Sequence, residues 1–291
     1  MAAVQAQRSL HHHGDKTSCY MLPNDDMERH RLHLQHLASV ALLGGDHIKA
    51  PLQDPKKIID IGCGVNADMT LFLAERFPNA KVYGVDLSPI HLENVPPNVE
   101  FIQGNVHHLI GKDERLQPGT FDFVFWRYLC MGVPDWEEHV SKVARLVREG
   151  GWVEMHEHFM PALWKDDRHV TKDSEWFGLL TKPKPWPEGD PFAVQYFQNL
   201  FQAQGFSEMG GLPVSAPFDP PEKLQGQDGQ AWARYVAEKH FIQWVYPIME
   251  RLFPGEEGKA DRARLAAEAE RIFATEDGKH FRFAVVWGRK V

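Results

Sequence analysis

The sequence lacks the features that mark secreted, membrane-embedded and disulfide-rich proteins. It has only three cysteines in 291 residues, and no two of them have Cys-x-x-Cys spacing, so neither a disulfide framework nor a structural zinc site is expected. No run approaches the roughly 18 apolar residues of a membrane span. Residues 1–14 lack the apolar centre of a signal peptide. We therefore expect a cytoplasmic protein, with the nucleus as the alternative compartment.

Basic clusters are also lacking. The formal net charge is −8 and no segment is rich in Lys and Arg, which argues against nucleic acid as a partner. Hydrophobic residues make up 43% of the chain and charged residues 25%, so a globular protein with a substantial core is expected. The length suits one large α/β domain, or one domain with a sizeable insertion.

The sequence does contain short β-branched and aromatic runs that alternate with amphipathic segments. This alternation predicts a mostly parallel sheet with helices on both faces. The predicted strands are residues 57–61, 81–86, 99–103, 121–126, 152–156 and 279–287, and the predicted helices are residues 24–43, 67–77, 136–148, 192–204, 232–253 and 259–274.

The remaining segments predict how the chain is divided. Asp25 and Glu28 have capping-box spacing at the start of the first helix. Proline and tryptophan make residues 161–191 an irregular insertion, and residues 214–221 are expected to be a proline-rich connection. The expected divisions are a disordered tail at 1–16, a helical lid at 17–50, and an α/β domain at 51–291 with substrate-cap insertions at about 160–191 and 222–275.

The segment from Asp60 through Gly62 and Gly64 lies between the first predicted strand and a helix. Its glycines allow a positive φ and close approach of the backbone to a ligand, and the helix start offers free N–H groups. Asp86 ends the second strand, where a carboxylate can accept the hydroxyls of a ribose. These features fit NAD and S-adenosylmethionine alike. The alternative interpretations are a plain strand–helix turn and, for Asp86, a helix cap.

Later segments distinguish the two cofactors. Gly104-Asn105-Val106 follows the third strand, where a side-chain amide can meet an adenine amino group. Asp122 lies in the opening of the fourth strand, and residues 146–153 give a helix, a glycine turn and the fifth strand. With Asp60, this series resembles the class I methyltransferases. The resemblance implies a Rossmann-like, mostly parallel seven-stranded sheet with helices on both faces, here with an N-terminal helical lid and a helical C-terminal insertion.

Further segments form a more specific set. They are Tyr20-Met-Leu-Pro-Asn-Asp-Asp-Met-Glu-Arg-His-Arg-Leu32 with Gln35-His36, Asp86-Leu-Ser-Pro-Ile90, Val95-Pro-Pro-Asn-Val99 and Trp287-Gly-Arg-Lys290. In combination they resemble the fungal LaeA-like methyltransferases, over residues 19–160 and the last strand. The resemblance implies S-adenosylmethionine as the cofactor and a role that is often tied to secondary metabolism.

Two residues depart from the family pattern. Asn66 stands where family members usually carry a third glycine, and asparagine tolerates left-handed backbone geometry better than most residues. Asn105 stands where the family often has aspartate, so one acceptor is kept and the charge is lost. These departures leave open either weaker cofactor binding or loss of methyl transfer.

The strand ends and the resemblance together give the candidate site. Tyr20 is expected to close over the cofactor, with simple packing as the alternative. The cofactor-binding candidates are Tyr20, Gly62, Cys63, Gly64, Asp86, Leu87, Asn105, Val106, Trp126 and Arg127, and the substrate candidates are Tyr128, Met131, His158 and Trp164.

Two histidines follow the fifth predicted strand. His158, and after it His156, are the candidates for a catalytic base, because histidine titrates near neutrality. Hydrogen-bonded structural roles are the alternative for both. No third ligand at a clear spacing completes a metal site, so none is predicted.

The expected function is O-methylation of a small hydrophobic molecule in secondary metabolism. Two alternatives stay open. One is a protein of the same fold that binds the cofactor but catalyses a non-methylating cyclisation or pericyclic step. The other is a LaeA-like regulatory partner in a protein complex. A NAD-dependent oxidoreductase is a more distant alternative. The expected partner is a small molecule, without nucleic acid or membrane, and a homodimer is considered.

Overall fold

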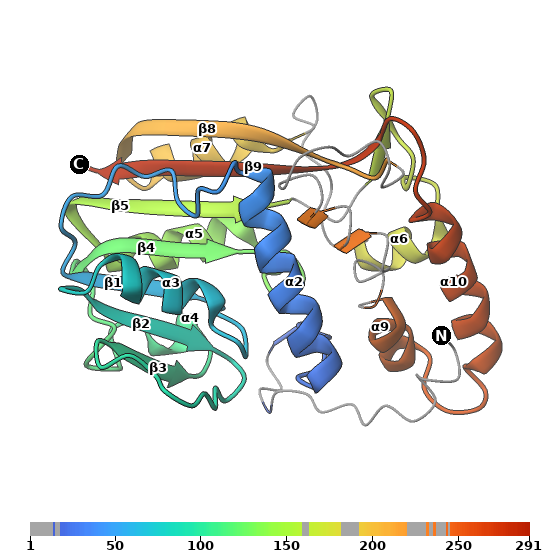
Figure 1. The fold of residues 1–291 in the computed structure, drawn as a ribbon, viewed down its shortest axis with the longest axis horizontal. Helices are drawn as coiled ribbons and strands as arrows, with labels where there is room; N and C mark the ends of the chain where they lie inside the picture. The colour runs from blue at the N-terminus through green and yellow to red at the C-terminus, as the bar shows by residue number, and fades with distance from the viewer. Residues whose placement is uncertain are drawn as a thin grey trace.

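A computed structural model describes residues 14, 18–158, 163–181, 192–219, 231–232, 235–236, 243 and 245–291. Its centre is one mixed sheet with helices packed against it (Figure 1). Five parallel strands lie in the order β3-β2-β1-β4-β5, and β9 pairs antiparallel with β5. The strand β8 in turn pairs antiparallel with β9. The predicted Rossmann-like fold class is therefore confirmed, but the described sheet has nine strands instead of the seven expected, because the hairpin of β6 and β7 joins it.

The strands mostly begin and end where the sequence predicts. A short hairpin, β6 with β7, extends the sheet by pairing with the first residues of β9. The bounds are β1 (Lys57–Ile61), β2 (Lys81–Asp86), β3 (Val99–Gln103), β4 (Phe121–Arg127), β5 (Val147–Glu157), β6 (Leu163–Lys165), β7 (Arg168–His169), β8 (Phe206–Pro217) and β9 (Lys279–Lys290).

The prediction of a proline-rich connection at residues 214–221 is wrong for residues 214–217, and residues 220–221 lie outside the described part. Residues 214–217 form the end of β8, whose backbone pairs along β9 from Phe206 to Pro217. The ladder shifts register between Ser207 and Gly210. Within the described sheet β8 has a partner on one side only, and such an edge strand tolerates prolines that a central strand excludes. Because of its glycines and prolines, this strand was not predicted from the sequence.

Helices cover both faces of the sheet. On one face, α3 packs on β1, β2 and β3, and on the other face α7 packs on β8 and β9. The alternation of side chains separates two apolar clusters, one containing Ile58 and Phe123 and the other Ile59 and Val124. The helices are α2 (Asp26–Leu42), α3 (Asp68–Arg76), α4 (Val106–Leu109), α5 (Trp136–Val143), α6 (Glu175–Thr181), α7 (Val194–Ala203), α9 (Val245–Leu252) and α10 (Lys259–Ile272).

Two further predictions are corrected by these bounds, and a third is described only in part. The helix predicted at 136–148 ends at Val143, because a 3-10 turn (Ala144–Leu146) leads directly into β5. The insertion predicted to be irregular at 161–191 contains β6, β7 and α6. Of the helix predicted at 232–253, the structure shows α9, and residues 233–234, 237–242 and 244 lie outside the described part.

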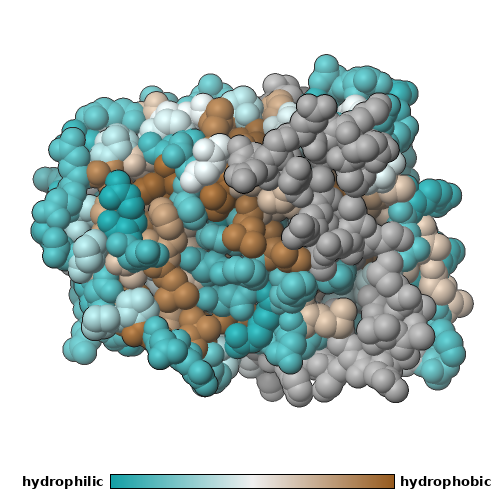
Figure 2. All heavy atoms as spheres, in the orientation of Figure 1, coloured by the Kyte–Doolittle hydropathy of each residue, from teal (hydrophilic) through white to brown (hydrophobic). Residues whose placement is uncertain are grey.

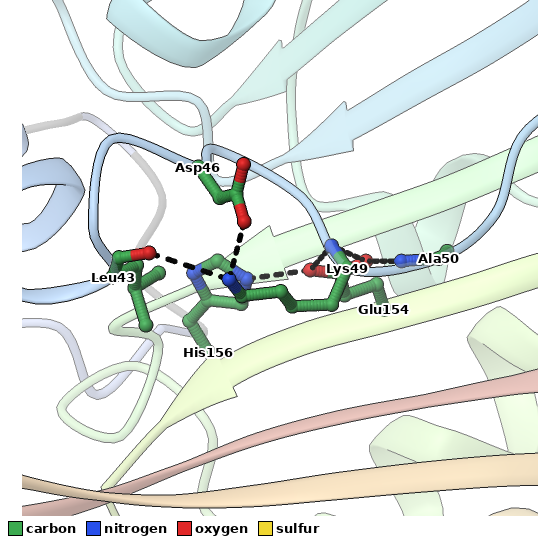
Figure 3. Close-up of polar contacts among 6 residues, drawn as sticks. All are labelled: Leu43, Asp46, Lys49, Ala50, Glu154 and His156. Atoms are coloured by element: carbon green, nitrogen blue, oxygen red, sulfur yellow. Dashed lines mark hydrogen bonds and ion pairs between the residues drawn. The ribbon is translucent and has the colours of Figure 1, made fainter.

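The first helix stands across the ends toward which β4 and β5 point (Figure 1). Its start is fixed as predicted, because the Asp25 side chain accepts the N–H of Glu28 at 2.9 Å. The chain that leaves it is held by Glu154 of β5. That buried carboxylate accepts the N–H groups of Lys49 and Ala50, at 2.9 and 2.6 Å, and contacts His156 at 2.7 Å (Figure 3). Both ends of α2 are thus tied down.

The surface agrees with a globular protein. Hydrophilic residues dominate the rim of the face in Figure 2, and apolar residues gather toward its middle. Across the described ranges, no helix is long and apolar enough to span a bilayer.

Candidate cofactor and substrate site

A cavity of about 580 Å³ opens where β1, β2 and β4 end. In doubly wound sheets, ligands bind at these carboxyl ends. Its wall combines strand-end loops with the N-terminal segment, α2 and Tyr235 of the C-terminal half. Besides residues of α2 and Tyr235, the lining includes residues 18–20, 22–24, 61–66, 85–88, 104–108 and 127–134.

The glycine turn after β1 has a backbone that side chains rarely adopt. Gly62 has φ of +67° and Gly64 has φ of +71°. A Cβ added at Gly62 would lie 2.3 Å from Leu129 Cδ2, so the turn is also closely packed. The Gly62 N–H donates to the Val85 carbonyl at 2.7 Å, which ties the turn to β2. This position therefore requires glycine for two independent reasons.

Asp86 has a fixed carboxylate at the cavity wall. It accepts the N–H of Gly64 at 2.9 Å and that of Ser88 at 2.8 Å. A carboxylate has about four lone-pair sites, so it can still accept the hydroxyls of a ribose. The cap-like role and the ligand-binding role that the sequence left open are therefore compatible in one side chain.

The two departures from the family pattern have simple structural explanations. Asn66 is not left-handed; its neighbour Ala67 has that geometry, with φ of +51°. The expectation that Asn66 replaces the third glycine by adopting a left-handed backbone is therefore wrong. Its Nδ2 instead donates to the Arg29 carbonyl at 2.6 Å and ties the turn to α2. Asn105 caps α4 by accepting the His107 N–H at 3.0 Å and lines the cavity.

Asp60 is a buried carboxylate at the end of β1. It accepts the Thr70 hydroxyl at 2.7 Å. Burial raises the pKa of this carboxyl to about 6, although the Thr70 bond and the charge of Arg127 act in the opposite direction. It stabilises the base of the glycine turn without lining the cavity.

Arg127 brings a positive charge into the cavity wall. Its Nη2 donates to Nδ1 of His36 at 2.5 Å. Burial and the neighbouring guanidinium lower the pKa of His36 to about 2, so this imidazole stays neutral and accepts the bond. Burial also lowers the pKa of Arg127 from its ordinary value.

The far end of the cavity carries a histidine beside a thiol. His158 Nε2 lies 3.6 Å from Cys130 Sγ, and its ring packs edge-on against Phe281. Tyr128 has a left-handed backbone, with φ of +55°, and its hydroxyl lies 2.8 Å from Ser39 Oγ. Such strain in a bulky residue is concentrated at functional sites.

A buried arginine, paired with a glutamate of its own helix, joins the N-terminal helix to the C-terminal half by a hydrogen bond. Arg31 contacts Glu28 at 2.7 Å, and its Nη1 donates to the Tyr235 hydroxyl at 3.0 Å. Tyr20 lines the same wall, and burial together with the Glu28 charge raises the pKa of its hydroxyl. Residues from both ends of the chain therefore close one side of the cavity.

Most of the predicted site residues meet in the cavity, and three do not. Trp126 points to the opposite face of β4, where its ring packs against His139 and Phe201. His156 is held by Glu154, and Trp164 stacks on His169. Those that line the cavity are Tyr20, Gly62, Cys63, Gly64, Asp86, Leu87, Asn105, Val106, Arg127, Tyr128, Met131 and His158.

The sequence prediction missed Arg31, His36 and Tyr235 as lining residues. A signal for Arg31 was present, because Glu28, Arg31 and Gln35 recur at helical spacing and place polar groups on one face of α2. Nothing local marks Tyr235, since its contact with Arg31 spans 204 positions.

Comparison with known proteins agrees with this geometry. The family described as a methyltransferase domain matches residues 29–208. The secondary metabolism regulator LAE1 of Cochliobolus heterostrophus is 28% identical over 230 residues, covering 74% of this chain and 73% of that protein. Methyltransferase str3 of Strobilurus tenacellus is 31% identical over 205 residues, covering 69% of this chain and 71% of that protein.

A likeness to solved structures concerns the fold alone. The geranyl diphosphate C-methyltransferase of Streptomyces coelicolor A3(2) has a TM-score of 0.51 at 12% identity, with coverage of 99% of this chain and 94% of that one. That protein was solved with Mg²⁺, geranyl diphosphate and S-adenosyl-L-homocysteine.

Proposed function

The chain belongs to the methyltransferase-domain family and is LaeA-like, and from this premise we propose that it methylates a hydroxyl group of a small hydrophobic molecule. S-adenosylmethionine is its cofactor. The acceptor class and the role of each side chain are the proposal.

The observation that carries the proposal is one cavity lined by both the cofactor motif and His158. The residues fit the cofactor, because the glycine turn excludes side chains where a ligand must approach and Asp86 offers acceptors for a ribose. When bound, the cofactor supplies a methyl group activated on a sulfonium. The protein must align the acceptor and exclude water, and such positioning can contribute roughly 7–11 kcal/mol.

His158 is the proposed base. A hydroxyl acceptor loses its proton during methylation, and the unprotonated ring nitrogen of a histidine can accept that proton. His158 is 7% exposed and contacts Cys130, which keeps its ring oriented toward that side of the cavity. It takes the acceptor proton, and the Tyr128 ring, tilted by 36° at a centroid distance of 5.7 Å, limits the movement of the imidazole.

A hydrophobic acceptor suits the remaining wall. Leu22, Leu129, Met131 and Val133 bring apolar side chains to the cavity. A small aromatic or polycyclic alcohol would bury its apolar surface there, as most small ligands do. Residues 17–50 are proposed to serve as a lid, because the cavity cannot be complete without residues of α2.

The experiment measures methyl transfer to a panel of hydrophobic phenols and alcohols, with their methyl ethers and matched amines as controls. The expected product gains one methyl on oxygen, and the methyl ethers gain none. His158→Gln should lower kcat about 100- to 10,000-fold with little change in KM. The matched control is His108→Gln, an exposed histidine that also lines the cavity.

Two results would count against the proposal. One is transfer to amines but not to hydroxyls. The other is a His158→Gln variant as active as His108→Gln across the pH range.

A further inference from the structure

Arg127 is a half-buried cation in the cavity wall, and within the described part of the chain it has no acidic hydrogen-bond partner. Among the residues that the structure describes, its hydrogen bond goes to neutral His36. Asp60 and Asp68 lie close enough to attract it electrostatically. However, the Asp60 carboxylate accepts from Thr70, and Asp68 contacts His33 at 2.9 Å. A partly desolvated guanidinium gains from a paired anion, and Arg127 lines the cavity, so it is suited to an anion bound there.

The contrast with Arg31 sharpens this point. Arg31 lines the same cavity, but both Nε and Nη2 donate to the Glu28 carboxylate, at 2.9 and 2.7 Å. Its charge is therefore neutralised within the protein. In the described ranges the hydrogen bond of Arg127 goes to a neutral imidazole, which fixes the guanidinium, and no carboxylate there forms a direct ion pair with it.

The position of Arg127 indicates which anion it meets. Ile61 pairs with Val85 on one side and with Trp126 on the other. Asp86 and Arg127, each one residue further along, therefore flank Gly62 on neighbouring strands, roughly 10 Å apart at ordinary strand spacing. The cofactor extends from its ribose through sulfur to a carboxylate. With its ribose at Asp86, such a ligand would reach across the glycine turn toward β4.

Resting on the proposed function, we propose that Arg127, oriented by His36, binds the carboxylate of the cofactor's methionine portion. A guanidinium offers several N–H donors in one plane, and charge-assisted hydrogen bonds to carboxylates are among the strongest in proteins. The site thereby distinguishes S-adenosylmethionine and S-adenosylhomocysteine from adenosyl ligands that lack the amino-acid carboxylate.

The test is calorimetric binding of S-adenosylhomocysteine and of 5′-methylthioadenosine, which lacks that carboxylate. Arg127→Gln should weaken the binding of S-adenosylhomocysteine roughly 10- to 100-fold. It should change the affinity for methylthioadenosine less than about twofold. Arg127→Lys keeps the charge but loses the planar donor pair, so its loss should be intermediate. The control Asp86→Asn should weaken the binding of both ligands.

A measurement on the wild-type protein protects the test against a variant that fails to fold. The carboxamide of S-adenosylhomocysteine should bind the wild type roughly 10-fold or more weakly than the acid. Equal affinities for acid and amide, or an Arg127→Gln change that affects both adenosyl ligands alike, would overturn the inference while leaving the proposed function standing. A wild type that binds neither adenosyl ligand would overturn both.

Discussion

At the scale of single residues, the site depends on positions where only one residue type satisfies the local geometry. Gly62 must combine positive φ with a close contact to Leu129. Asp60 must place a carboxylate in the core beneath that turn. Each requirement gives a prediction with a matched control in the same chain.

Gly62→Ala should destabilise the protein and weaken cofactor binding. The left-handed backbone costs an alanine about 1 kcal/mol, and displacement of Leu129 adds about 1–3 kcal/mol. The control is Gly119→Ala, which has the same φ of +67° but nothing within 4 Å of the added Cβ. Chemical denaturation and S-adenosylhomocysteine titration measure both effects. Equal losses of stability and intact binding in the two variants would contradict this packing argument.

Asp60 predicts a particular pH dependence. Its pKa rises from 3.8 in the unfolded chain to about 6 in the native state. Between those pH values the native state holds a proton that the unfolded state has lost, so this group's contribution to stability falls as pH rises. Asp60→Asn removes that fall. The free energy of unfolding of the variant relative to wild type should rise by up to about 3 kcal/mol from pH 4 to pH 7.

The control for Asp60 is a carboxyl that shifts in the other direction. Burial alone would raise the pKa of Asp122, but N–H donors of Lys56 and Lys57 and the Arg148 side chain lower it. The contribution of Asp122 is therefore complete once pH exceeds its ordinary value of 3.8, so above about pH 5 the stability of Asp122→Asn relative to wild type should stay level. Denaturation curves from pH 4 to pH 7 give the free energy of unfolding of both variants relative to wild type. Parallel pH profiles for the two variants would show that burial of Asp60 does not cause the pH dependence.

At the scale of elements, α2 belongs to the site as much as the sheet does. It contributes His36 and Arg31 to the cavity, and its Arg29 carbonyl receives the Asn66 amide. The sequence predicted this helix and its Asp25 cap, because capping is local. It could not predict the contacts of its inner face, because those depend on which strand ends the helix crosses.

Glu28→Gln should unfold the protein at markedly lower denaturant concentration. Glu28 is 2% exposed and Arg31 5%, so the change leaves a buried guanidinium without its counter-ion, at a cost of about 3–5 kcal/mol. Glu256→Gln removes one partner of an exposed pair, Lys259 with Glu256 at 3.3 Å, and should have no measurable effect. Identical denaturation midpoints for the two variants would show that α2 does not depend on this ion pair.

At the scale of the whole molecule, the sequence predicted the parallel half of the sheet better than the antiparallel half. The bounds of β1, β2 and β3 agree because each is a short apolar run closed by glycine or a polar residue. The strand β8 was missed because its glycines and prolines are acceptable only at an edge, and edge position is a property of the complete sheet.

The same division holds for the candidate site. Gly62 and Asp86 could be recognised because strand-end motifs are local in the sequence. Tyr235 could not, since its place follows from packing of the C-terminal half on α2. Trp126 was proposed for the cavity from its place at the end of a strand, but alternation along β4 turns its side chain into the core.

The most direct test of the account is a crystal structure of the protein with S-adenosylhomocysteine. The account predicts the ligand in the cavity beside Gly62 and Gly64, with its ribose hydroxyls on Asp86 and its sulfur facing the side of His158. A ligand bound elsewhere, or one in this cavity without contact to Asp86, would contradict it.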